Sequence, residues 1–295
     1  MDVSPEDLQH WQTWVGTSHE DEDLLALRHA RLMAATLGLD ASAWRPGHPL
    51  PPLWHWIYFL EGLPATALGR DGHPARGGFL PPVSLPNRLW AGGRVNFPAP
   101  LPLGGAARKR SQVLRLQHKA GRSGELVFVT VLHQVFRGDQ LCIQEEHDIV
   151  YKGALKPAAG NGTAAAEPPA PAVSPDAANP PPPAHQRSWT PDSTQLFRYS
   201  ALTFNGHRIH YDQDYCRDVE AYANLVVHGP LVATQLAALG QELAGRPLRG
   251  FSYRGLQPAT LGQTLSLQAR HSSEDRVELE SVLPNGQTNM QAQAW

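Results

Sequence analysis

The chain has 295 residues, of which 41% are hydrophobic, and a formal net charge of −2 at pH 7. This length allows one large domain or two small ones, and the near-zero charge argues against a nucleic-acid or membrane-surface partner. The two cysteines, Cys142 and Cys216, match no metal-ligand spacing, so we expect reduced thiols and no metal site. The sequence shows neither a signal peptide nor an apolar run long enough to cross a membrane, which predicts a cytoplasmic protein.

The first 40 residues are predicted to be helical. Thr17 and Glu20 have the spacing of a capping box, apolar residues then recur at helical spacing, and Gly38 is placed to end the helix. The apolar stripe of this segment suits packing against a sheet.

Residues 45–104 are rich in proline, glycine and aromatic side chains. Trp54, Trp56 and Tyr58 alternate along the chain, as on one face of a strand. This aromatic surface is either part of the hydrophobic core or the lining of a pocket for an apolar chain. Residues 111–151 follow as β-prone runs with a turn at Gly138 and Asp139, which predicts an antiparallel meander.

Residues 156–188 are built mainly of Ala, Pro, Gly, Asn and Thr. Such a segment buries too little apolar surface to offset its ordering entropy, so we expect a disordered linker between two halves, at residues 1–155 and 189–295. In the second half, residues 196–202 are expected to enter as a strand. A helix is expected from His228 to Leu239, ended by Gly240, and four strands follow at residues 249–255, 264–270, 276–282 and 287–295.

The two halves share one order of elements, a helix followed by antiparallel strands. This order predicts an α+β double hotdog, in which two antiparallel sheets each wrap a central helix. No sequence repeat accompanies it.

Residues 204–212 carry two histidines, an amide, an arginine and a carboxylate without regular polar alternation, which indicates an irregular segment and a candidate site. A histidine flanked by an amide and an acid can exchange a proton with bound water. The helix start at Gly229 offers free N–H groups that stabilise an oxygen gaining negative charge. Water addition to a double bond conjugated with a thioester needs both features.

This segment resembles the hydratase motif Gly-Asp-x-Asn-Pro-x-His of the MaoC-like (R)-specific enoyl-CoA hydratases. Aligned on the last histidine, His210 falls on the catalytic histidine, Asn205 on the catalytic aspartate and His207 on the asparagine. The run His-Arg-Ile-His-Tyr-Asp at 207–212 and the run Leu-Trp-Ala-Gly-Gly-Arg at 89–94 are similar to two-hotdog hydratases of mesaconyl-CoA and itaconyl-CoA, in which asparagine is usual at this place.

The resemblance implies a role for each residue of the segment. His210 would be the proton shuttle, Asn205 would position the water, and the Gly229 N–H would polarise the thioester carbonyl. His207 or Asp212 would orient or tune His210, although each could equally be a structural residue of the turn. His228 would support the site from the start of the central helix, where a purely structural role is the stronger alternative. No cofactor is implied, because CoA is part of the substrate.

A branched dicarboxylic substrate would also need a cation for its free carboxylate. The candidates are Arg88, Arg94, Arg208 and Arg254, with Trp54 and Trp56 lining the acyl pocket. The first half lacks the motif and is expected to be non-catalytic. Hotdog sheets often extend edge to edge, so a homodimer or larger homo-oligomer is expected. The alternatives are a non-catalytic acyl-CoA binding or scaffold protein and a thioesterase; the latter usually needs a carboxylate on the central helix, and residues 231–239 have none.

Overall fold

The computed structural model describes residues 3–121, 124–153 and 183–295. Its strands form one antiparallel sheet in the order β1-β3-β4-β5-β2-β7-β10-β9-β8-β6. The first half contributes β1 (Ser18–Leu24), β2 (Asn87–Asn96), β3 (Ala106–Gly121), β4 (Gly124–Arg137) and β5 (Gln140–Lys152). The second half contributes β6 (His185–Trp189), β7 (Gly250–Gly255), β8 (Leu265–Ser273), β9 (Arg276–Val282) and β10 (Thr288–Ala294).

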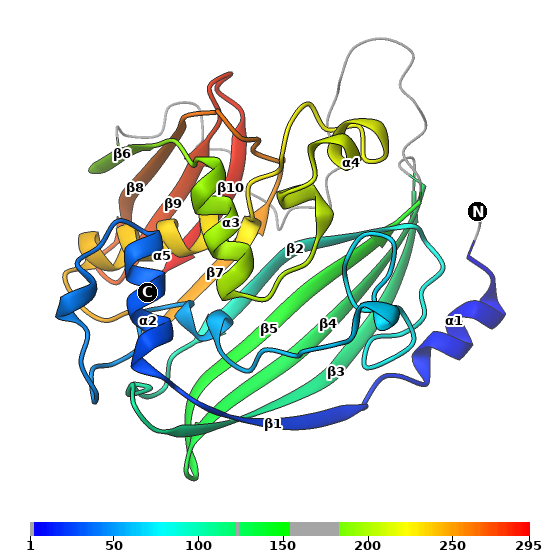
Figure 1. Cartoon of the computed structure of the whole chain (residues 1–295), viewed down its shortest axis with the longest axis horizontal. Coiled ribbons are helices and arrows are strands. Elements are labelled where there is room, and N and C mark those ends of the chain that lie inside the picture. Colours follow the sequence, from blue (N-terminus) through cyan, green and yellow to red (C-terminus); the bar gives the residue numbers. More distant parts are fainter. Residues whose placement is uncertain (1–2, 122–123, 154–182) are drawn as a thin grey trace.

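The two halves repeat one topology. The order β1-β3-β4-β5-β2 of the first half recurs as β6-β8-β9-β10-β7 in the second, and β2 pairs with β7 where the halves meet. The halves are therefore two five-stranded sheets joined edge to edge (Figure 1). The strands expected in residues 111–151 are present as β3, β4 and β5, and the four expected in residues 249–295 are present as β7 to β10. The expected turn at Gly138 has a positive φ of 57°.

The central helix of the second half is α5 (Gly229–Ala244), which packs against β7, β8, β9 and β10. Proline follows its first residue, and its buried face includes Leu231, Leu236 and Leu239. The helix does not end at Gly240, as the sequence suggested, but at Gly245, whose φ of 63° is left-handed. A Cβ at position 240 would lie 3.0 Å from the Leu279 side chain, so this glycine permits close packing of helix on sheet.

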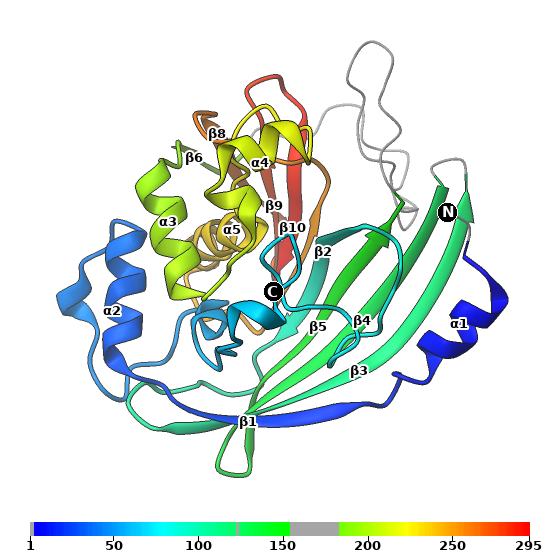
Figure 2. The same cartoon turned by 45° about the vertical axis from the view of Figure 1, so that its right-hand side comes forward.

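The first half differs from the expectation for its N-terminal segment. Residues 18–24 form β1, not a helix, because their acidic side chains pair with the basic part of β3. Glu20 lies opposite Arg110, and its carboxylate forms an ion pair with Arg108 at 3.1 Å. The helix is the shorter α2 (Leu27–Thr36), which packs beside α3 (Ser193–Leu202), as Figure 2 shows.

Two other expectations are corrected. Trp54–Ile57 is the 3-10 helix η2 and not a strand, and the segment at 196–202 belongs to helix α3, which is capped by Asp192. Residues Asn87–Asn96, to which the sequence assigned no element, form β2. The linker predicted at 156–188 falls mainly outside the described residues, and its last four positions belong to β6. The remaining elements are α1 (Pro5–Gln12), α4 (Gln213–Asp218), η1 (Ala41–Ala43), η3 (Ala65–Ala67) and η4 (Arg208–His210).

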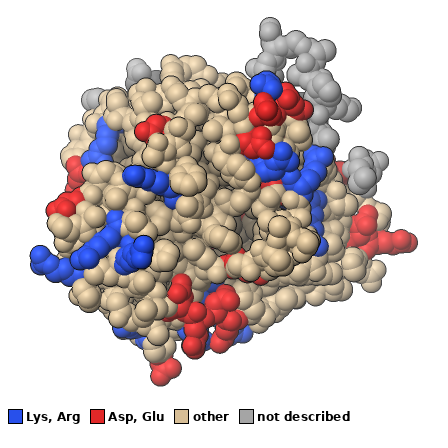
Figure 3. Space-filling model, in the orientation of Figure 1, with Lys and Arg blue, Asp and Glu red and all other residues tan. Residues whose placement is uncertain are grey.

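The main hydrophobic core joins the two halves, since residues of α2 and η2 share one buried cluster with α5 and the strands around it. On the face seen in Figure 3, acidic side chains gather at the lower edge and basic ones at the left, and neither sign dominates. None of the helices in the described ranges combines the length and the apolar character that a membrane span requires.

Candidate active site

The segment at residues 204–212 is irregular, as expected, and connects α3 to α4. Phe204 has a φ of 48°, which turns the chain out of α3. The Asn205 N–H then donates to the Ser200 carbonyl at 2.8 Å, and the Asn205 Oδ1 accepts from the His207 N–H at 3.0 Å. The amide at 205 is thus fixed at the head of the segment, and η4 carries His210.

His210 is buried, and one hydrogen bond, to the Val226 carbonyl, determines which of its ring nitrogens carries the proton. Its Nδ1 lies 2.8 Å from the Val226 carbonyl, which can only accept, so Nδ1 carries the proton and Nε2 presents a lone pair. Burial lowers the pKa of His210 to about 3, despite the opposing hydrogen bond to Val226. The imidazole is therefore neutral at pH 7, which is the form that can accept a proton.

His228 lies directly on His210, with the ring centroids 3.6 Å apart and an interplanar angle of 18°. It is fully buried, its Nε2 is 2.8 Å from the Ser200 hydroxyl, and its buried Nδ1 has no partner among the described residues. Burial and then the proximity of His210 lower its pKa well below the ordinary value. His228 is also the N-cap residue of α5, so it ties the start of the helix to His210.

Gly229 begins α5 directly beneath an aromatic ring. A Cβ at this position would lie 2.6 Å from the Cε3 of Trp90, so only glycine allows this approach. N–H groups in the first turn of a helix lack intrahelical acceptors and sit at the positive end of the dipole. The start of α5 can therefore donate to a carbonyl oxygen placed between His228 and Trp90.

The aromatic side chains around Trp90 are held by polar contacts. Trp90 stacks on Tyr253 at 4.5 Å and meets the edge of Trp56 at 5.9 Å. The Trp56 indole donates to the buried carboxylate of Glu145 at 3.0 Å, and His55 bonds the same carboxylate at 2.9 Å. Trp56 is thus part of this wall, whereas Trp54 is a core residue, 3% exposed, in the main hydrophobic cluster.

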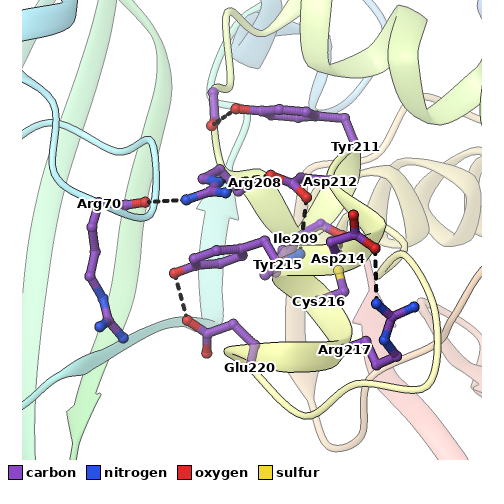
Figure 4. A network of polar contacts seen from close by, with 11 residues as sticks. Arg70, Arg208, Ile209, Tyr211, Asp212, Asp214, Tyr215, Cys216, Arg217 and Glu220 are labelled. Carbon is purple, nitrogen blue, oxygen red and sulfur yellow. Dashed lines mark hydrogen bonds and ion pairs between the residues drawn. The ribbon is translucent and has the colours of Figure 1, made fainter.

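Asp212 and Arg208 have structural partners of their own (Figure 4). The Asp212 Oδ1 caps α4 by accepting from the Tyr215 N–H at 2.9 Å, and its Oδ2 pairs with Arg208 at 2.7 Å. Arg208 also donates to the Arg70 carbonyl and lies over the Tyr215 ring. The carboxylate that was expected to tune His210 is therefore engaged elsewhere, and so is the Arg208 guanidinium.

The other three arginines differ in their surroundings. Arg94 forms ion pairs with Asp148 at 2.8 Å and Glu146 at 2.9 Å. Arg254 lies on β7, opposite Gly92 of β2. Arg88 lies on β2 two residues before Trp90, hence on the same face, and no carboxylate of the described residues forms an ion pair with it.

Two residues that the sequence did not suggest lie beside the segment. Asp71 and His73, from the loop after η3, are joined by a 3.2 Å contact between the Asp71 carboxylate and His73 Nδ1. The His73 ring lies 4.1 Å from that of His207, which is 5.5 Å from that of His210. Donor atoms of Asp71, His73 and His207 lie within 4.8 Å of one another, residue types that can also hold a divalent cation.

Electrostatics around this group favour neutral imidazoles next to an ionised acid. Burial is the main cause that lowers the pKa of His207 to about 3, and the charge of Arg88 contributes to it. Burial would raise the pKa of Asp71, but the hydrogen bonds from His73 outweigh it and hold that pKa well below its usual range. Asn205, His207, Asp71, His73 and Arg88 are all partly exposed, so the site opens on their side.

Comparison with known proteins places this geometry in a family. The family model described as hydroxyacyl-thioester dehydratase type 2 matches residues 53–261. The chain is 44% identical over 284 residues, 96% of both proteins, to a mesaconyl-C(4)-CoA hydratase of Chloroflexus aurantiacus.

Solved structures show the same fold. A MaoC-like dehydratase from Phytophthora capsici matches all of this chain and 97% of its own, with a TM-score of 0.68 at 15% identity. A protein of Mycobacterium tuberculosis described as having a double hotdog fold matches 95% of each chain, with a TM-score of 0.57 at 16% identity. These likenesses confirm the predicted α+β double hotdog, and the family match confirms the resemblance read from residues 204–212. The chain therefore belongs to the hydroxyacyl-thioester dehydratase type 2 family.

Proposed function

We propose that the protein adds water to the conjugated double bond of a branched dicarboxylic enoyl-CoA, such as mesaconyl-CoA or itaconyl-CoA, or removes it in the reverse direction. Membership of the family makes the protein a hydro-lyase of acyl thioesters. The name of the relative from Chloroflexus aurantiacus supports mesaconyl-CoA as the first substrate to test. The observation that carries the mechanism is the contact of His210 with His228 at the start of α5.

His210 exchanges the proton of the water. Its Nδ1–H is held by the Val226 carbonyl, so Nε2 is the free basic atom, and the low pKa keeps that atom unprotonated at neutral pH. Asn205 has an amide N–H that can donate to the same water, since its Oδ1 is occupied by the His207 N–H. The amide positions the water and transfers no proton itself.

The start of α5 stabilises the oxygen of the thioester. As water attacks the β-carbon, the double-bond electrons move toward the carbonyl, and the Gly229 N–H donates to the enolate-like oxygen. Because His228 links α5 to His210 by stacking, the donor and the base are held in one arrangement. The wall of Trp90, Trp56 and Tyr253 covers the acyl chain.

Arg88 is the best candidate for the second carboxylate of the substrate. Arg94 and Arg208 are neutralised by carboxylates of the protein, whereas Arg88 has no such ion pair within the described residues. The positive charge of Arg88 reaches the site, because it contributes to the lowered pKa of His207 and of His73. A guanidinium there can bind a carboxylate through two parallel hydrogen bonds.

Two other activities make different products. Hydrolysis would release free thiol, and simple binding would leave the thioester unchanged. On α5, the residues up to Leu239 carry no carboxylate, and Glu242 is exposed and paired with Arg187 at 2.7 Å, which disfavours a thioesterase.

The test is incubation with mesaconyl-CoA and crotonyl-CoA while the absorbance of the conjugated thioester and the free thiol are followed together. Loss of absorbance without thiol supports hydration, whereas thiol release or an unchanged panel of enoyl-CoAs contradicts it. The homo-oligomer expected from the sequence stays a prediction, to be measured by light scattering.

A further inference from the structure

The first half reaches into the active site through one loop. The Asp71 carbonyl accepts from the Arg208 N–H at 2.9 Å, and the Arg70 carbonyl accepts from the Arg208 guanidinium. Gly72 lies so close to Gly206 that a Cβ on it would be 1.9 Å from the Gly206 carbonyl oxygen. This loop is therefore docked, backbone to backbone, on the residue that follows Asn205.

Asp71 and His73 form a carboxylate–imidazole pair on that loop. The Asp71 Oδ1 accepts from the His73 N–H at 3.1 Å, and the Asp71 Oδ2 lies 3.2 Å from His73 Nδ1. An ionised carboxylate only accepts, so Nδ1 carries the proton and Nε2 is the basic atom. A pair of this kind fixes the tautomer of the imidazole and stabilises the imidazolium that forms when Nε2 takes a proton.

The imidazoles of His73, His207 and His210 form a continuous row. Ring centroids are 4.1 Å apart in the first step and 5.5 Å apart in the second. Asp71 stands at one end of the row and His210 at the other, and the charge of Arg88 faces the group from β2. Among the described residues, Asp71 is the carboxylate bonded to this row, since Asp212 is engaged by Arg208 and the start of α4.

Hydration requires two proton exchanges, one at the water and one at the α-carbon. Asn205 can perform neither, because an amide neither accepts nor gives a proton at neutral pH. His210 alone serves the water. A second imidazole or carboxylate beside the substrate can perform the exchange at the α-carbon while His210 serves the water.

We propose that the first half completes the active site: His73, held by Asp71, exchanges the proton of the α-carbon while His210 exchanges that of the water. The inference rests on the proposed function. In hydration, a water O–H bond breaks, its proton goes to His210 Nε2, and the oxygen bonds to the β-carbon. His207 lies between His210 and His73 and passes this proton on, so that His73 Nε2, which starts unprotonated, receives it. The double-bond electron pair then forms the new C–H bond at the α-carbon with the proton of His73 Nε2, and all three imidazoles are neutral again, as at the start.

The main test is Asp71→Asn, which removes the charge and keeps an oxygen that can accept from the His73 N–H. We expect kcat to fall by at least about 100-fold, as for a lost acid–base group, with KM and the melting temperature nearly unchanged. The matched control is Asp139→Asn in the exposed turn before β5, which should retain full activity. A normal kcat for Asp71→Asn overturns the proposal.

A second readout separates catalysis from packing. In the dehydration direction, deuterium at the α-carbon of the hydrated thioester should lower the rate of His73→Gln by a larger factor than the rate of the wild type. The reason is that removal of the α-proton becomes rate-limiting in the variant. An isotope effect equal to that of the wild type assigns His73 a structural role and overturns the proposal.

The cation alternative is tested on the same protein. Full activity after chelation with EDTA supports proton exchange by Asp71 and His73, whereas loss on chelation and recovery with zinc or manganese shows a metal site there and overturns the proposal. A wild-type protein that hydrates no enoyl-CoA refutes the proposed function and this inference together. A wild type that is active beside a fully active Asp71→Asn refutes this inference alone.

Discussion

The imidazoles of His210 and His228 lie face to face, with centroids 3.6 Å apart. One ring belongs to the irregular segment after α3, and the other is the N-cap of α5. The stack therefore connects His210, which exchanges the proton of the water, to the start of α5, which donates to the thioester carbonyl. Both rings are buried and neutral, so they contact each other without charge repulsion.

His210→Ala should lower turnover by at least about 100-fold, because it removes the acid–base group of the water. The change is measured as kcat with the best enoyl-CoA found in the panel. Circular dichroism must show a folded variant, since the cavity left beside His228 also costs stability. A folded His210→Ala protein with nearly normal turnover would remove this residue from the mechanism.

The dependence of activity on pH should be flat where free histidines titrate. His207 and His210 have their pKa lowered by burial to about 3, so both stay neutral from pH 5 to 8 and kcat should change little there because of them. A clear inflection in kcat near 6.5, the ordinary pKa of histidine, would show that the basic imidazole is not buried as described.

Stability should depend on pH with a defined sign. Between about 3 and about 6.5 the unfolded chain binds protons at His207 and His210 that the folded protein does not. The free energy of unfolding is then largest above about 6.5 and falls as the pH decreases through this window. Urea unfolding measures this free energy at pH 7 and at pH 5. An equal free energy of unfolding at the two pH values would contradict the burial of the His207 and His210 rings.

The contact of Gly229 with Trp90 predicts a sensitive position. Gly229→Ala places a methyl group 2.6 Å from the Trp90 ring, so the ring or the helix start must move. We expect a loss of about 1–3 kcal/mol in the free energy of unfolding, as for overpacking, together with a lower kcat. Gly62→Ala is the matched control, because a Cβ at 62 meets nothing within 4 Å. Equal effects of the two substitutions would contradict the close approach.

Arg88 predicts a change in substrate preference. Arg88→Gln should lower kcat/KM for mesaconyl-CoA by about 10-fold to 100-fold, which corresponds to a lost hydrogen-bonded charge pair of about 1.5–3 kcal/mol. Crotonyl-CoA has no second carboxylate and should be affected little. Exposed Arg45→Gln serves as the control. A parallel loss with both substrates would assign Arg88 to the structure of the site and not to recognition of the carboxylate.

The start of α5 and the four strands after it were predicted correctly because their signals are local. Proline at the second position of α5 and the alternation around Val277 and Leu279 depend only on neighbouring residues. The segment at residues 18–24 carries a helix-start signal, but its acidic side chains meet the basic side chains of β3, about ninety positions away in the sequence. No local pattern reveals such a distant partner, and it is the pairing with β3 that makes residues 18–24 a strand.

In the candidate site too, residues identified by local sequence signals could be predicted, and residues placed by long-range contacts could not. His210, Asn205 and Gly229 could be named from one motif and one helix start, since each lies within a short segment. Asp71 and His73 could not, because their place depends on how the loop after η3 docks on Gly206. The preference for Arg88 over Arg94 and Arg208 likewise needed the ion pairs of those two residues.

The most direct measurement is incubation of the full chain with mesaconyl-CoA in water labelled with oxygen-18, followed by mass spectrometry of the CoA products. The account predicts an intact CoA thioester heavier by one labelled water, formed by the wild type and lost in His210→Ala. Free CoA with a labelled acid, or an unchanged thioester at every enzyme concentration, would contradict it.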